Sequence, residues 1–171
     1  VLAIQSLAKP VIAAVNGVAA GAGANIALVA DFVVAAESAI FVQSFIQIGL
    51  IPDSGGTFFL PRLVGLAKAK ELIMLGEKLS ARDASALGLI YRAVPEPEFH
   101  ATVSNLATRL AALPTKTIHM VKQAMNSSAT SSLATQLETE LRLQIEAAAT
   151  ADYREGVDAF LAKRPPNFRG R

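Results

Sequence analysis

The chain has 171 residues, 52% of them hydrophobic and 18% charged, which allows a sizeable core and argues against a disordered segment. It has no cysteine and only two histidines, which excludes disulfides and thiolate chemistry, argues against a metal site and is compatible with the reducing cytoplasm, where we expect the protein to act. The net charge is +2, and the basic excess lies near the end of the chain with little aromatic interleaving, so nucleic acid is not an expected partner.

The first expected elements alternate between strands and a helix. Residues 11–15 and 32–36 are short apolar runs that predict buried strands, and residues 22–30 predict a buried helix between them. This order indicates a parallel pair with a right-handed crossover, and residues 40–42 add a short extended piece. Residues 10–30 are uncharged and long enough to cross a membrane, but the polar residues and glycines among them argue against a membrane span.

Helices dominate the rest of the chain. The expected elements are helices at residues 57–64 and 67–75, a helix from the capping box at residues 80–83 to Gly88, a strand at 89–94, and helices at 99–113, 116–125, 133–149 and 152–162. We therefore divide the chain into an α/β part, residues 1–94, and an all-α part, residues 95–171. An apolar i, i+4 stripe on the third of the last four helices is open to two uses, a buried core or a contact between subunits: Leu133, Leu137, Leu141 and Ile145.

Only two or three expected strands precede the helical part. A parallel sheet of that size would leave its edges exposed and its faces uncovered. We therefore expect further residues upstream of the first strand.

Two turns carry the candidate chemistry, and the first is the glycine-rich turn Gly21-Ala22-Gly23. This turn begins a helix, where the first N–H groups have no internal partner and favour an anion. Such N–H groups can hold the oxygen of a thioester as it becomes an enolate. Tight packing of the helix against a strand is the alternative explanation of the small residues. The chain has neither a GxGxxG spacing nor a Walker lysine, which excludes dinucleotide and P-loop sites.

The second turn, residues 51–57, carries Asp53 as a lone carboxylate among apolar residues and glycines. Apolar surroundings raise the pKa of a carboxylate and suit it to act as a base near neutral pH. The alternative is that Asp53 only caps the helix that follows the glycines. Asp31 lies directly before a strand, and we expect it to stabilise a turn rather than to act in catalysis.

These motifs together resemble the crotonase, or enoyl-CoA hydratase/isomerase, superfamily. The matching segments are KPVIAAVNG at residues 9–17, GAG at 21–23, IPDSGGT at 51–57, SARDA with GLI at 80–84 and 88–90, and GVDAFLAKR at 156–164. The resemblance covers the whole chain and implies an α/β fold: the second half of a spiral of ββα turns, followed by an all-α C-terminal trimerisation region. In the family, an upstream segment supplies the first oxyanion N–H and the adenine-binding loop, and the assembly is a trimer or a hexamer.

Two departures from the family pattern favour an isomerase over a hydratase. Typical hydratases carry two glutamates that orient and deprotonate water, at positions that hold Asn25 and Phe45 here. Asp53 stands where some isomerases keep their acid/base residue. With ADYREG at residues 151–156, the turn most resembles the ring-epoxide isomerases of phenylacetate degradation, which convert an epoxidised phenylacetyl-CoA to its oxepin-CoA form and also shift double bonds in unsaturated acyl-CoAs.

The resemblance therefore implies an acyl-CoA isomerase with Asp53 as the base, coenzyme A as part of the substrate, and no metal or other cofactor. The N–H of Ala22, next to Gly21, is implied as the donor to the thioester oxygen, with the N–H of Gly23 as a substitute. Asn25 and Phe45 are implied to lie near the acyl group. Phe160 and Lys163 are implied to contact the CoA bound to a neighbouring subunit. A hydratase or another reaction of the family is one alternative. A non-catalytic acyl-CoA-binding or oligomerisation fragment is the other.

Overall fold

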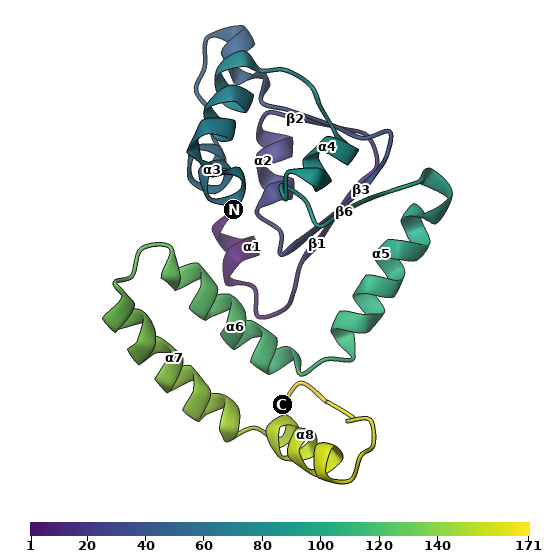
Figure 1. The fold of residues 1–171 in the computed structure, drawn as a ribbon, viewed down its shortest axis with the longest axis vertical. Helices are drawn as coiled ribbons and strands as arrows, with labels where there is room; N and C mark the ends of the chain where they lie inside the picture. Colours follow the sequence, from purple (N-terminus) through teal and green to yellow (C-terminus); the bar gives the residue numbers. More distant parts are fainter. The chain divides into compact units, whose positions relative to one another are not determined.

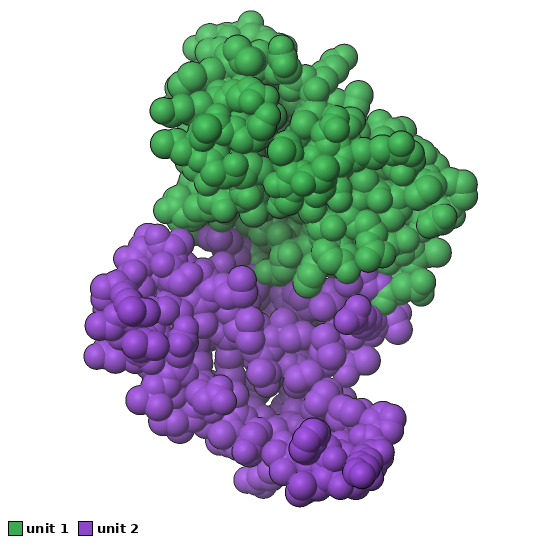
Figure 2. Space-filling view, in the orientation of Figure 1, with its two compact units in different colours: residues 1–4, 11–105 green, residues 5–10, 106–171 purple.

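The computed structural model describes residues 1–171 as two compact units. Unit 1 comprises residues 1–4 and 11–105, and unit 2 comprises residues 5–10 and 106–171 (Figure 2). Unit 1 contains all the strands, and unit 2 is helical. The last strand, β6 (Arg92–Val94), ends at the boundary expected between the α/β and all-α parts, and α5 (Glu96–Ala111) continues from unit 1 into unit 2.

Two small sheets form the framework of unit 1 (Figure 1). The first has the order β1-β3-β6 and is parallel throughout, with β1 at Ile12–Val15 and β3 at Phe32–Ala36. In the second, β4 (Ile40–Val42) pairs parallel with β2 (Val18–Ala20) and antiparallel with β5 (Leu79–Ser80). The predicted parallel pairing of residues 11–15 with residues 32–36 is confirmed.

The helices of unit 1 end where the sequence provides residues suited to turns. A helix at Ala22–Leu28, α2, connects β2 to β3. The long α3 (Gly56–Leu75) is interrupted at Gly65, whose φ of 77° and ψ of 160° are not helical, and it ends at the left-handed Gly76. The shorter α4 (Ala81–Ala86) begins with the predicted capping box, in which the Ser80 hydroxyl accepts a hydrogen bond from the Asp83 N–H at 3.1 Å.

The core of unit 1 is almost entirely apolar. Four of the five residues of β3 are buried, as expected for a parallel strand that is covered on both faces. Leu60 of α3 and Val34 of β3 are among its largest fully buried side chains, and the third is the polar Asn25 of α2. A buried amide needs hydrogen-bond partners, so Asn25 calls for a specific local arrangement.

Unit 2 is formed by the end of α5 and by α6 (Thr115–Ser128), α7 (Leu133–Ala148) and α8 (Ala151–Leu161). Within this unit α6 and α7 lie side by side (Figure 1). Hydroxyl groups cap the last two helices: Ser132 accepts from the Thr135 N–H at 3.2 Å, and Thr150 accepts from the Tyr153 N–H at 3.1 Å. All four helices expected after residue 94 are therefore confirmed.

The apolar stripe of α7 is exposed in this chain. Leu133, Leu137, Leu141 and Ile145 all face solvent, and Leu143 is the one buried residue of the helix. The interpretation of the stripe as core of this chain is therefore wrong. Its use as a contact between subunits stays a prediction.

Four short elements were not predicted: α1 (Leu2–Ser6), β2, β5 and the 3₁₀ helix η1 (Ser44–Ile48). Each has five residues or fewer, too few to show a period in the sequence. None of the helices is both long and apolar enough to cross a membrane.

Candidate active site

The start of α2 presents backbone N–H groups without acceptors. The first bond of the helix runs from the Asn25 N–H to the Gly21 carbonyl at 3.1 Å, and Gly21 donates its own N–H to Val42 at 2.9 Å. The N–H groups of Ala22 and Gly23 therefore have no acceptor in the chain. Ala22 is half-buried and Gly23 is exposed, so both can be reached by a ligand.

Gly21 and Gly23 differ in how strictly the structure requires a glycine at their positions. Gly21 has φ 51°, and a Cβ there would lie 3.3 Å from the Ser44 hydroxyl and 3.4 Å from the Phe45 ring. Backbone conformation and tight packing thus both require a glycine at this position. A Cβ on Gly23 would meet nothing within 4 Å. Packing therefore accounts for Gly21 and leaves open space beside Gly23.

Asp53 lies on a turn with two left-handed residues. Ser54 has φ 50° and Gly55 has φ 83°, and the Gly56 N–H donates to the Asp53 carbonyl at 2.9 Å, as in a type I′ turn. The N-cap of α3 is Gly55, without a side-chain cap, and the Asp53 carboxylate forms no bond to another protein group. The interpretation of Asp53 as a helix cap is therefore wrong.

The surroundings of Asp53 also differ from the expectation. Its side chain is exposed, and the neighbouring Ile51 is 82% exposed instead of packing over it. This chain therefore holds the carboxylate on a firmly built turn without enclosing it in apolar side chains.

Two buried amides connect the Asp53 turn to α2. The Asn25 side chain is 1% exposed, and its amide nitrogen donates to the Asp53 carbonyl at 2.9 Å. The Asn25 amide oxygen accepts from the Gln43 amide nitrogen at 2.8 Å. Both ends of the Asn25 amide are thus bonded inside the protein. This placement differs from the expectation that Asn25 lines the pocket at the acyl group.

Phe45 is buried as well, at 9% exposure on η1, with its ring edge beside Gly21. Unit 1 therefore brings the turn 21–23, Asn25, Phe45 and the Asp53 turn into one neighbourhood. Asp31 is separate from it, and its carboxylate accepts the Val11 N–H at 2.7 Å. This bond is structural, but it reaches a residue 20 positions away instead of the local turn that we expected Asp31 to stabilise.

The two remaining predicted residues lie in unit 2, at the end of α8. Phe160 is 83% exposed. Lys163 has φ 52° and occupies the left-handed position of a Schellman-type turn, in which its N–H donates to Phe160 at 3.2 Å and the Arg164 N–H donates to Ala159 at 3.0 Å. Glycine is the usual residue at such a position, and strained backbone of this kind clusters at functional sites.

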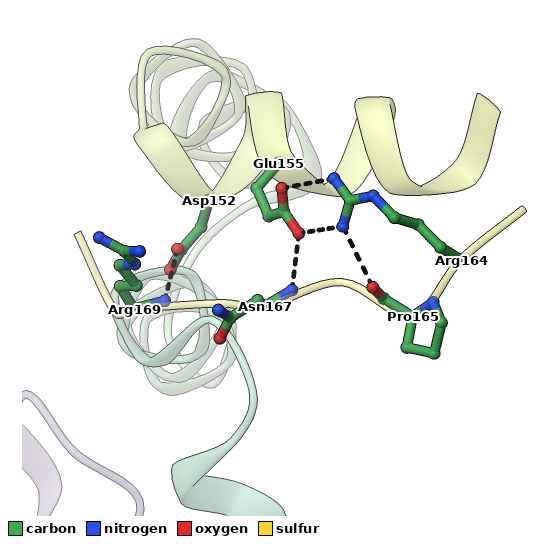
Figure 3. Close-up of polar contacts among 6 residues, drawn as sticks. All are labelled: Asp152, Glu155, Arg164, Pro165, Asn167 and Arg169. Carbon is green, nitrogen blue, oxygen red and sulfur yellow. Dashed lines mark hydrogen bonds and ion pairs between the residues drawn. The ribbon is translucent and has the colours of Figure 1, made fainter. Parts of the chain in front are cut away.

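Residues 164–171, which we call the terminal strap, fold back along α8 (Figure 3). The Glu155 carboxylate accepts two hydrogen bonds from the Arg164 guanidinium, at 2.7 and 2.9 Å, and one from the Asn167 N–H at 2.7 Å. The bonds from Arg164 and then from Asn167 lower the pKa of Glu155 to about 2, because they favour the ionised carboxylate.

A second acid holds the far end of the strap. Asp152 is 4% exposed, and its two oxygens accept the N–H groups of Arg169 and Gly170 at 2.7 and 2.8 Å. The Asp152 N–H donates to the Arg171 carbonyl at 3.2 Å. The acids of α8 thus set the course of the strap that follows Lys163.

Two open grooves lie within unit 2. The first has a volume of about 540 Å³ between α6 and α7, and its lining includes Leu137 and Leu141 of the stripe. The second has a volume of about 450 Å³ beside α8, and its lining includes Tyr153, Val157 and Phe160. Both grooves are mostly apolar, as expected of surfaces that bind an apolar group or another chain.

The whole chain, residues 1–171, matches the family model of enoyl-CoA hydratase/isomerase. The chain belongs to this family. The predicted resemblance and the α/β fold with its helical C-terminal part are thereby confirmed. A solved structure described as a putative enoyl-CoA hydratase/isomerase from Mycobacterium abscessus superposes on the chain with a TM-score of 0.95 at 36% identity, over 99% of this chain and 65% of the other.

Two similar curated members of the family have different names. The chain is 51% identical over 99% of its length to a probable enoyl-CoA hydratase from Rhodobacter capsulatus. It is 52% identical over 98% of its length to the 1,2-epoxyphenylacetyl-CoA isomerase of Escherichia coli K12. The chain spans 66% and 64% of the length of these relatives, just under two thirds.

One residue that contacts Asn25 was not predicted from the sequence. Gln43 is 5% exposed and lies between β4 and η1, where its amide contacts Asn25. The sequence does contain a signal for it, because Gln43 is an amide next to the apolar run of residues 40–42. A lone amide beside a buried strand indicates a hydrogen-bond partner elsewhere in the fold.

Proposed function

We propose that the protein is an isomerase of CoA thioesters, with Asp53 as its acid/base residue. In the proposed reaction the Asp53 carboxylate takes a proton from the carbon next to the thioester carbonyl. The electrons delocalise into a conjugated enolate, whose oxygen accepts a hydrogen bond from the N–H of Ala22, or from that of Gly23 as a substitute donor. The protonated Asp53 then returns the proton to a carbon further along the chain, so the double bond moves and no atom is gained or lost.

One observation carries this proposal: the Asp53 turn is hydrogen-bonded to the same helix that begins with the free N–H groups. Asn25, which holds the Asp53 carbonyl, lies three residues after Ala22. That separation is roughly 4.5 Å along a helix axis. The bond from Asn25 therefore connects the turn that carries the proposed base to the first turn of the helix whose free N–H groups are the proposed oxyanion donors.

The positions of Asn25 and Phe45 support an isomerase rather than a hydratase. Where the family resemblance places the two carboxylates of a hydratase, this chain has a neutral amide bonded inside the protein and an aromatic ring. Neither group can deprotonate water. The name of the relative from Escherichia coli supports the same choice and suggests an epoxidised phenylacetyl-CoA as one substrate. The family resemblance adds an unsaturated acyl-CoA as another candidate substrate.

A hydratase is the second candidate function, because the similarly close relative from Rhodobacter capsulatus carries that name. It would add water across the double bond, so its product would be heavier by one water.

We further propose that the protein acts as a trimer or hexamer, with the exposed stripe of α7 against a second copy. Phe160 and Lys163 would then contact the CoA of a neighbouring subunit, consistent with their exposure and with the strained backbone of Lys163.

The test is the reaction of the intact protein with a cis-3-enoyl-CoA in D₂O, followed by mass spectrometry. Because Asp53 is exposed, its carboxyl group can exchange its proton with D₂O before it delivers one, so we expect a product that has a shifted double bond and contains deuterium. We expect Asp53→Asn to lower kcat by roughly a hundredfold or more. Glu98→Gln is the matched control, because Glu98 is another exposed carboxylate of unit 1 without a bond to the protein.

Each other outcome contradicts the proposal in its own way. A product heavier by one water restores the hydratase. Binding of the substrate without turnover indicates a non-catalytic acyl-CoA-binding or oligomerisation protein. An isomerase unaffected by Asp53→Asn uses another base.

A further inference from the structure

We infer that Asn25 and Gln43 are positioning residues, which together form a buried amide relay that holds the Asp53 turn against α2. The relay runs from the Gln43 amide nitrogen to the Asn25 amide oxygen, 2.8 Å, and from the Asn25 amide nitrogen to the Asp53 carbonyl, 2.9 Å. The inference rests on the proposed function, since it assigns to the relay the placement of the proposed base relative to the N–H of Ala22.

The backbone fixes the direction of the relay. The Asp53 carbonyl can only accept hydrogen bonds, so the end of the Asn25 amide that faces it must be the NH₂ group. The Asn25 oxygen then faces Gln43, which must present its own NH₂ group. The Gln43 oxygen, at the far end, is buried without a partner in the chain. Gln43 therefore stays in this orientation at the cost of one unpaired acceptor, which indicates that its bond to Asn25 is worth keeping.

The turn lies directly on the relay. A Cβ on Gly56 would overlap the Asn25 amide nitrogen, so the second glycine of the turn is what allows this close approach. Asn25 also provides the one side-chain hydrogen bond to the turn, and the Asp53 carboxylate itself bonds to no protein group. The position of the carboxylate thus depends on its backbone, and the relay restrains that backbone.

This arrangement predicts a specific kinetic effect. Displacement of a catalytic group by about 1 Å can lower the rate a hundredfold without weakening substrate binding. Loss of the relay should therefore lower kcat and leave KM unchanged. A relay with a merely structural role would lower stability and leave the kcat of the folded protein unchanged.

The test compares two relay variants of the intact protein in the isomerase assay. Asn25→Asp keeps the shape and replaces the donor to the Asp53 carbonyl by an acceptor, and we expect kcat to fall roughly ten- to a hundredfold. Gln43→Met keeps the approximate length and removes the donor to Asn25, and we expect a smaller loss, about threefold to tenfold. If Asn25→Asp does not fold, Gln43→Met alone decides the question.

Gln47→Met is the matched control. Gln47 is a neighbouring amide of η1 whose nitrogen donates to the Gly76 carbonyl at 3.1 Å, away from the Asp53 turn. We expect it to keep the wild-type kcat. In addition, Gln43→Met combined with Asp53→Asn should lower kcat no further than Asp53→Asn alone, because the relay acts through Asp53.

Three results would overturn the inference. A folded Gln43→Met variant with the kcat of the wild type contradicts it, as does an equal loss of kcat in Gln47→Met. A full additional loss in the double variant shows that the amides act by another route. If the wild type is an active isomerase, any of these three results overturns the inference and leaves the proposed function in place. A wild type that does not isomerise the substrate contradicts both the proposed function and this inference.

Discussion

Replacement of Asp152 by asparagine should open the terminal strap of α8. Both oxygens of this buried carboxylate accept backbone N–H groups, from Arg169 at 2.7 Å and Gly170 at 2.8 Å. Hydrogen bonds to a charged group contribute about 1.5–3 kcal/mol each. An asparagine keeps one acceptor and turns its NH₂ group toward the other N–H, so at least one bond is lost. We therefore expect the closed strap to lose about 2 kcal/mol relative to the open one.

Limited proteolysis with trypsin reports the opening of the strap, because the peptide bond after Arg169 lies within the strap. A loss of about 2 kcal/mol raises the population of the open strap about thirtyfold. Cleavage after Arg169 in the intact protein should accelerate by a similar factor when opening is fast relative to cleavage. Asp158→Asn is the control, since Asp158 is an exposed acid of the same helix without a hydrogen bond to the strap. An acceleration below threefold in Asp152→Asn, or an equal one in the control, would refute the reasoning.

Two further predictions concern the same end of the molecule. The pKa of Glu155 is lowered to about 2 by its bonds from Arg164 and Asn167, so its contribution to stability is fully present above the ordinary carboxyl pKa of about 4.5 and disappears as the pH falls toward 2. The difference in unfolding free energy between wild type and Glu155→Gln, measured by urea unfolding, should therefore be constant above about pH 5.5 and shrink below it; a difference that grows in acid contradicts this assignment. Lys163→Gly should raise the unfolding free energy by about 1 kcal/mol, because glycine adopts the left-handed φ of 52° without strain. It should also raise the KM for the CoA thioester, because the proposed contact of Lys163 with CoA is lost. A less stable variant would contradict the backbone strain, and an unchanged KM would contradict the contact with CoA.

Local patterns in the sequence were sufficient for most helices and strands of this chain. The apolar run at β3 and the capping box at Ser80 depend on neighbouring residues only, and both are confirmed. The short strands β2 and β5 were missed, because a strand of two or three residues exists only through its pairing with another strand, here β4. The exposure of the α7 stripe was likewise undecided, because an amphipathic pattern predicts an apolar face without identifying what covers it.

The sequence by itself determined the family, the fold class and the residue types of the candidate site, because the glycine turns and the lone Asp53 are contiguous motifs with recognisable spacing. The tertiary structure alone decided how these motifs are connected. Asn25 meets Gln43 and the Asp53 carbonyl across separations of 18 and 28 residues, and Gln43 was not recognised in the sequence at all. The physical reason is that an amide bonds equally well to many partners, so its actual partner depends on which segments of the chain the packed core brings together.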